Sequence, residues 1–310
     1  MSTPNPTYSF TADQSGERLD KVIVTHVGDQ LTRSQIQQFI RDGHVSVNGE
    51  PAKSGWRLKG GETITVRVPP PPEDPRITPV IIPLNVIYED ADIAVINKTA
   101  GLVVHPGAGA EKSTLVHAIL AQYPEIAQMN YAASRRGIVH RLDKDTSGII
   151  LIARNERSMH RLMVQFQKRT IDKQYVALLE RTPKTTSGRI NVPIERDPNN
   201  RQKMHVSHNG RTAVTEFFVE ELYEDGYAFV RLNLLTGRTH QIRVHMAYLN
   251  TPIAGDRLYG LRRQRLPLTR QFLHATQIAF DHPRTGERMS FSAPLALDLK
   301  TVLDTLRPIR

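Results

Sequence analysis

The sequence predicts an α+β protein with a mixed, mainly antiparallel central sheet and a smaller α+β module at its amino-terminal end. Two observations lead to this prediction. Short β-prone runs alternate irregularly with few amphipathic helices, which favours antiparallel pairing over a doubly wound parallel sheet. Four consecutive prolines, Pro69–Pro72, cannot join a helix or a central strand. They therefore divide the chain into a small and a large part.

The composition limits the possible classes of function. The chain has 310 residues, of which 39% are hydrophobic, enough for a sizeable core and about two domains. A formal net charge of +10 favours a polyanionic partner, although an anionic membrane surface would also suit a basic chain. The absence of cysteine excludes disulfides, thiolate metal sites and cysteine nucleophiles. Because no apolar run approaches the roughly 20 residues that cross a bilayer, we expect a cytoplasmic protein without a membrane partner.

The amino-terminal part has the pattern of a small helix-and-hairpin module. Residues 1–15 are polar at their start and contain proline, so we expect a flexible terminus. Two short helices follow, the second behind a Thr32 cap, and Asn48-Gly49 marks a hairpin turn. A strand near Thr63–Val68 closes the module. We therefore assign 16–68 to a small domain, 69–79 to a proline-rich linker and 80–310 to one larger domain.

The larger domain begins with two short strands on either side of an acidic turn, and further strands and helices follow. Expected strands cover 86–88, 93–97, 149–153, 174–179 and 229–235, and expected helices cover 114–123 and 156–168, with a third starting near a Thr239 cap. In the helix at 156–168, Met159, Leu162, Met163 and Phe166 share one face and should point inward. Residues 189–214 are rich in Gly, Asn and Arg, which indicates a hairpin arm.

The most informative stretch is the polar loop Gly137–Gly148, which runs into an apolar segment that predicts a buried strand. A loop fixed against the core in this way can hold catalytic side chains. Its two carboxylates, Asp143 and Asp145, are not separated by sequence chemistry alone. No metal site is expected, since His240 and His245 do not share a helical face and no H-E-x-x-H spacing occurs.

The motif His140-Arg141-Leu142-Asp143, followed by Thr146-Ser147-Gly148, resembles the signature of the large-subunit ribosomal RNA pseudouridine synthases. Gln174-Tyr175 and the segment 236–245 resemble later motifs of that family, in the same order. The small module resembles the RNA-binding domain of an S4-type ribosomal protein, which makes the chain most similar to the D-type members. This resemblance implies a sheet split by an active-site cleft. It also implies cofactor-free isomerisation of uridine by a monomer acting on ribosomal RNA or the pre-ribosomal large subunit.

The same resemblance implies roles for individual residues. Asp143 matches the catalytic carboxylate, Arg243 its paired cation, and Tyr175 the phenol that lies against the uracil ring. Arg141 matches the arginine that fills the space left by a flipped nucleotide, with His140 and Leu142 beside it in the substrate site. Asp145 matches the motif only loosely and is interpreted as structural. Basic residues expected to contact RNA are Arg33, Arg41, Arg196, Arg201 and Lys203, although a solvated charged surface would look the same.

Two other functions fit the residues. A non-catalytic RNA-binding assembly factor would keep the fold and the basic module. A nucleic-acid hydrolase would instead use Asp143 and Asp145 around magnesium, and chelation would inactivate it.

Overall fold

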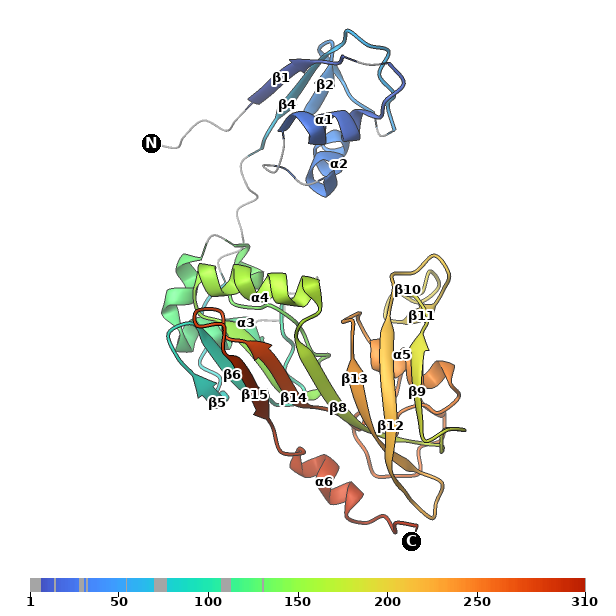
Figure 1. Cartoon of the computed structure of the whole chain (residues 1–310). Coiled ribbons are helices and arrows are strands. Elements are labelled where there is room, and N and C mark those ends of the chain that lie inside the picture. Colours follow the sequence, from blue (N-terminus) through green and yellow to red (C-terminus); the bar gives the residue numbers. More distant parts are fainter. Residues whose placement is uncertain are drawn as a thin grey trace. The chain divides into compact units, whose positions relative to one another are not determined.

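The computed structural model describes residues 7–13, 15–27, 31, 33–53, 55–69, 77–106, 113–129 and 131–309. The chain divides into two compact units, residues 1–76 and 77–310 (Figure 1). Most of the expected linker, residues 70–76, and the expected Thr32 cap lie outside the described residues. The two units are treated separately below.

The small unit packs two helices on a four-stranded antiparallel sheet with the strand order β1-β4-β2-β3. Its elements are β1 (Thr7–Thr11), α1 (Leu19–Val27), α2 (Arg33–Arg41), β2 (Val45–Val47), β3 (Glu50–Pro51) and β4 (Thr63–Arg67). Residues from both helices and from β2 and β4 form one apolar core. The expected helices and hairpin are therefore present.

The expectation of a flexible terminus at residues 1–15 is wrong for residues 7–11. These form β1, which pairs with β4 from Thr7↔Arg67 to Thr11↔Thr63. Phe10 packs against the core of the small unit and stacks on His26, with ring centroids 4.1 Å apart. The alternation of polar residues with Tyr8 and Phe10 is a strand pattern that the proximity of the chain end obscured.

The large unit is built on a nine-stranded sheet with the order β5-β6-β7-β14-β8-β13-β12-β9, and β15 pairs with β14. The pair β7–β14 is parallel, and the other pairs recorded in this sheet are antiparallel. The predicted α+β class with a mixed, mainly antiparallel sheet is thus confirmed. The strands are β5 (Asn85–Glu89), β6 (Ile93–Lys98), β7 (Ser147–Ala153), β8 (Asp172–Leu179), β9 (Ser187–Asn191), β12 (Val214–Leu222), β13 (Ala228–Leu234), β14 (Leu273–Asp281) and β15 (Arg288–Ser292).

The helices of the large unit are α3 (Leu115–Gln122), α4 (Glu156–Lys168), α5 (Gln241–Tyr248) and α6 (Leu297–Leu303). In α4, Met159 and Leu162 are buried as expected, but Met163 is 44% exposed, so its predicted inward orientation is wrong. The helix face that packs is narrower than the stripe of apolar residues. No helix among the described residues is both long enough and apolar enough to cross a bilayer.

Helix α5 starts differently from the expectation. Its N-cap is His240, with a left-handed φ of 56°, rather than Thr239, and no side chain caps the helix. The turn is held from inside the helix instead, because the side-chain oxygen of Gln241 accepts hydrogen bonds from the Arg238 amide (3.0 Å) and the Thr236 hydroxyl (2.7 Å). This arrangement directs the segment 236–243 back toward β8.

The hairpin arm predicted at 189–214 is present as β10 (Ile194–Arg196) paired with β11 (Met204–Val206). Figure 1 shows this arm beside α5, at the opposite end of the sheet from β5 and β6. The strand β7, buried along all seven residues, lies in the other half of the sheet and carries the loop that precedes it.

Candidate active site

A cavity of about 810 Å³ lies within the large unit. It is lined by the loop before β7, by α4 and β8, and by the segment that joins β13 to α5. Asp143, Tyr175 and Arg243 all line it, although they are far apart in the sequence. The three residues expected to form the catalytic centre are therefore brought to one cavity.

Asp143 forms an ion pair with Arg243, whose Nη1 lies 3.2 Å from Oδ2 of the carboxylate. The two side chains are 16% and 9% exposed, so water screens the pair only weakly. Among the described residues no hydrogen bond reaches the other carboxylate oxygen, Oδ1. The carboxylate is thus fixed through one oxygen only, in a side chain that lines the cavity.

Arg243 is itself held by Asp256, a residue that the sequence analysis missed. The guanidinium donates from Nε to Oδ2 (2.7 Å) and from Nη2 to Oδ1 (2.9 Å) of Asp256, whose side chain is fully buried. Burial lowers the pKa of Arg243, but the hydrogen bonds and charge of Asp256, joined by the charge of Asp143, raise it above its ordinary value. Asp256 therefore fixes both the orientation and the charge of the cation next to Asp143.

Tyr175 is 6% exposed and lies on β8, facing the same cavity. Burial and the negative charge of Asp143 hold the pKa of its phenol well above its usual value. The hydroxyl therefore stays protonated at neutral pH and can donate a hydrogen bond, while the ring offers an apolar face to a planar ligand.

The loop that carries Asp143 is fixed by a buried lysine, also missed at the sequence level. Lys98, which ends β6, is 1% exposed, and its Nζ donates to the carbonyls of Thr99 (2.8 Å), Leu102 (2.9 Å) and Lys144 (3.0 Å). Burial lowers the pKa of Lys98 to about 8. A lysine two residues after the apolar run 93–96, within the same strand, is the signal in the sequence that could have indicated it.

The neighbours of Asp143 in the motif have different surroundings. His140 accepts a hydrogen bond at Nε2 from the Leu151 amide (2.8 Å), and burial lowers the pKa of the ring to about 3, so it is neutral. Leu142 is buried at the cavity, whereas Arg141 is exposed there without a partner among the described residues. Asp145 is outside the cavity lining. Its position fits the structural interpretation.

The basic residues expected to contact RNA do not gather at this cavity. In the small unit, Arg33 pairs with the buried carboxylate of Asp20 (3.0 Å), and Arg41 donates to Gln38. On the hairpin arm, Arg196 donates to the carbonyl of Arg201. Lys203 is partly buried on the same arm. Arg196, Arg201 and Lys203 are therefore outside the lining of the Asp143 cavity, and Arg33 and Arg41 belong to the other unit.

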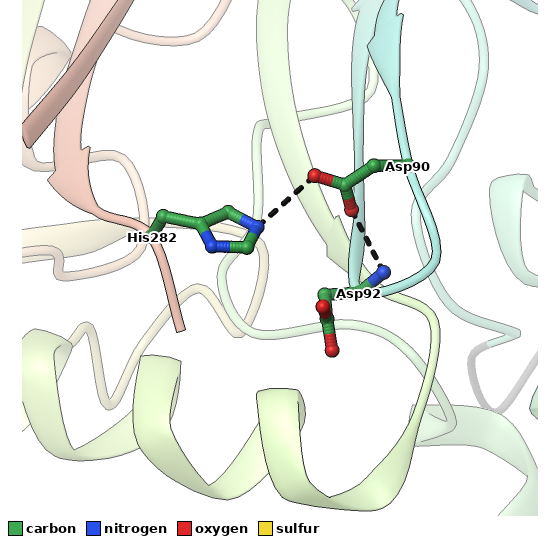
Figure 2. Close-up of side chains that lie close together, drawn as sticks. All are labelled: Asp90, Asp92 and His282. Carbon is green, nitrogen blue, oxygen red and sulfur yellow. Dashed lines mark hydrogen bonds and ion pairs between the residues drawn. The ribbon is translucent and has the colours of Figure 1, made fainter. Parts of the chain in front are cut away.

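A second group of acidic and histidine side chains lies at a turn of the large unit. Figure 2 shows Asp90, Asp92 and His282, which could each direct one ligand atom to a common point. Asp90 accepts from the Asp92 and Ile93 amides on one oxygen and from Tyr88 and His282 on the other. Both oxygens of Asp92 accept from Arg284. With its oxygens already bonded, the group is suited to joining two turns rather than to holding a cation.

Comparisons with known proteins identify the family to which this chain belongs. Residues 92–248 match the family described as RNA pseudouridylate synthase, and residues 17–64 match the S4 domain. An uncharacterized RNA pseudouridine synthase of Bacillus subtilis is 41% identical over 295 residues, covering 95% of this chain and 96% of the relative. A Vibrio parahaemolyticus protein named ribosomal large subunit pseudouridine synthase D is 41% identical over 308 residues, covering 95% and 92%.

Solved structures extend the likeness to the fold. Human RNA pseudouridylate synthase domain containing 1 superimposes with a TM-score of 0.59 at 26% identity, over 73% of this chain and 89% of that one. Human RNA pseudouridylate synthase domain containing 4 superimposes with a TM-score of 0.58 at 25% identity, over 73% of this chain and 94% of that one. The family match covers half of the chain, and the relatives cover nearly all of it. This chain therefore belongs to the RNA pseudouridine synthases, the enzymes that isomerise uridine in RNA, and carries an S4 domain at its amino-terminal end.

Proposed function

We propose that this enzyme converts specific uridines of large-subunit ribosomal RNA, within a stem-loop, using Asp143 as the nucleophile and no cofactor. The observation that carries the proposal is the ion pair of Asp143 with Arg243 beside Tyr175, in a cavity of a size that admits a flipped nucleotide. Relatives named for the large ribosomal subunit support the choice of RNA. We further propose that the enzyme acts as a monomer.

The proposed reaction makes limited demands on the protein. The bond between C1′ of the ribose and N1 of the uracil breaks, the base turns, and C5 bonds to C1′; N1 then carries a proton and C5 has lost one. The carboxylate of Asp143 either attacks covalently or stabilises the separated ribosyl fragment, and both paths require it to be ionised. Arg243 stabilises that charge. Tyr175 supports the uracil ring, and its hydroxyl assists proton transfer.

The remaining residues are proposed to bring the RNA to this centre. Arg141 stacks in the space that the target nucleotide leaves, and His140 and Leu142 shape the pocket around it. Residues 16–68 act as the RNA-binding domain, 69–79 as a linker and 80–310 as the catalytic domain. Contacts to phosphates are assigned to the basic residues Arg33, Arg41, Arg196, Arg201 and Lys203.

The test is site-resolved mapping of pseudouridine after incubation of transcripts of large-subunit ribosomal RNA with the protein, with and without a chelator. We expect new pseudouridine at a few stem-loop positions, at equal rates in both samples. No conversion on any ribosomal transcript, together with tight RNA binding, would favour an assembly factor. Chain cleavage that stops in chelator would favour a magnesium-dependent hydrolase.

A further inference from the structure

Four basic side chains line the Asp143 cavity close to one another, and the proposed chemistry uses none of them. Arg169 follows the last residue of α4, and Lys173 lies on β8 two residues before Tyr175, on the same face of the strand. Arg211 follows the hairpin arm, and Arg238 lies in the segment before α5. These four residues are called the cation wall below.

The cation wall has no acidic partner. None of its four members forms an ion pair with a carboxylate among the described residues, and the nearest acidic side chain in the sequence, Asp172, pairs with Arg288 instead. Several arginines elsewhere in the large unit are paired with carboxylates, as in Arg154–Glu125, Arg231–Glu220, Arg270–Asp298 and Arg284–Asp92. Within the described residues the wall therefore carries an excess of positive charge, which the charge of Asp172 next to Lys173 offsets only in part.

The four charges also lie close enough to repel one another. Burial lowers the pKa of Lys173 to about 8, and the neighbouring charge of Arg169 adds to this lowering. Burial, followed by the charges of Arg211 and Arg169, holds the pKa of Arg238 below its ordinary value. Lys173 and Arg238 are partly buried, whereas Arg169 and Arg211 are exposed. Holding the two partly buried cations beside like charges costs free energy that a bound anion would offset.

The cation wall also forms the edge of a second hollow, of about 460 Å³. Arg169 and Lys173 line both spaces. The second hollow contains a row of amide side chains on three adjacent strands, because Gln174 pairs in register with Gln277 on one side and with Asn233 on the other. Two carboxylates, Asp172 and Glu216, also line it, so its phosphate contacts are expected only at the edge that Arg169 and Lys173 form. Amides offer the donors and acceptors that match the edges of unpaired bases.

We propose that the cation wall is a phosphodiester subsite that guides the RNA strand next to the target nucleotide from the Asp143 cavity into the second hollow. The residues that line both spaces, the excess of positive charge at that edge and the amide row beyond it fit a single strand of RNA as the occupant. This inference depends on the proposed function for the identity of the strand. It adds a path for the RNA and the residues that hold it.

The test measures RNA affinity as a function of salt for Arg169→Gln, Lys173→Gln and the double variant. The substrate uridine is kept unconverted by an added Asp143→Asn substitution. We expect each single variant to bind about tenfold more weakly, the loss of one charge-assisted contact. The slope of log affinity against log salt should fall by about 1 for each lost phosphate contact. Matched controls are Arg262→Gln and Lys184→Gln, exposed residues outside both spaces, which should change neither quantity.

A second measurement identifies the phosphate. A neutral methylphosphonate is placed in turn at each position flanking the target, and each modified RNA is titrated with the Lys173→Gln protein and its parent. At one position the loss of affinity from the methylphosphonate and the loss from Lys173→Gln should not add, because both changes remove the same contact. If the losses of affinity from the methylphosphonate and from Lys173→Gln add at every position, the phosphodiester subsite is overturned. It is also overturned if Arg169→Gln and Lys173→Gln keep the wild-type salt dependence of binding while their thermal unfolding is unchanged.

The outcomes for the subsite and for the proposed function are separable. Conversion by the wild-type protein on the same RNA tests the proposed function alone. An active wild type whose binding ignores the cation wall overturns only the subsite. An inactive wild type whose binding still depends on the cation wall overturns only the proposed function.

Discussion

Two networks of carboxylates and cations lie in the large unit, and they differ in how completely the carboxylate oxygens are bonded. At the turn in Figure 2, Asp92 accepts from Asn155, Ser158 and Arg284, and both of its oxygens are used. At the cavity, one oxygen of Asp143 is paired with Arg243, and no bond among the described residues reaches the other. Both carboxylates belong to side chains less than one-fifth exposed.

This difference separates a structural carboxylate from a reactive one. A fully bonded carboxylate stabilises the elements that supply its donors, but it has no lone pair free for a substrate. A carboxylate fixed from one side only, by a cation that a second acid orients, keeps an oxygen for chemistry and loses little entropy when it reacts. The comparison predicts that substitutions in the two networks affect different properties of the protein.

The largest expected effect belongs to Asp143→Asn. Isomerisation should fall by more than about a thousandfold, because the amide cannot act as the anionic nucleophile. RNA affinity and the melting temperature should stay close to wild type, since the shape is unchanged. Single-turnover conversion of a ribosomal transcript measures the rate.

Asp145→Asn is the matched control, two residues along the same loop and outside the cavity lining. It should retain most of the activity. If Asp145→Asn were the inactive variant and Asp143→Asn the active one, the assignment of the nucleophile would be wrong.

Asp256→Asn should have the next largest effect. It removes the charge that orients Arg243, so the ion pair with Asp143 loses its fixed geometry, and we expect the rate of conversion to fall by about 10- to 100-fold with RNA affinity retained. Removing one partner of a buried pair also destabilises the fold. The rate is therefore measured well below the melting temperature of the variant.

Asp256→Glu keeps the charge on a longer side chain and should recover part of the rate. A variant that unfolds normally and converts RNA at the wild-type rate would show that Asp256 does not position Arg243.

The sequence predicted five of the nine strands of the large sheet, β5, β6, β7, β8 and β13, and the composition of the centre, because both depend on local patterns. The run 149–153 is apolar enough to identify a buried strand, and β7 covers it. Asp143, Tyr175 and Arg243 were identified by resemblance to motifs, and the cavity brings them together. A motif preserves residue types in order, so it carries this information without any three-dimensional input.

The supporting residues were missed because their role depends on long-range contacts. Asp256 is 13 positions from Arg243 in an irregular segment, and Lys98 is 46 positions from the carbonyl of Lys144 that it binds. Neither contact has a sequence period. The cation wall was overlooked for the same reason, since its members come from separate segments and only the fold shows that, among the described residues, no carboxylate forms an ion pair with them.

In the bonded network, Asp92→Asn should affect stability rather than catalysis. The substitution removes the charge that Arg284 pairs with and leaves an amide group as a poorer acceptor, so we expect unfolding to require about 1–3 kcal/mol less free energy. Denaturant titration measures this, and the rate per folded molecule should not change. Asp304→Asn, at the exposed pair with Lys300, is the control and should cost less than about 0.5 kcal/mol.

The smallest expected effect is the pH dependence of that stability difference. Although burial opposes ionisation, the hydrogen bonds from Arg284, Asn155 and Ser158 lower the pKa of Asp92 to about 2. In the unfolded chain the pKa of Asp92 returns to about 4, so the folded state binds the proton less readily than the unfolded state. The stability that the ionised Asp92 contributes is therefore fully present above about pH 4. The free energy of unfolding of the wild type minus that of Asp92→Asn should therefore be constant near neutral pH. This difference should shrink as the pH falls from about 4 toward 2, because protonation of Asp92 then removes the charge that the asparagine variant does not have. A difference that stays constant down to pH 2 would show that the bonds at this turn do not depend on the charge of Asp92, and the contrast with Asp143 would then rest on catalysis alone.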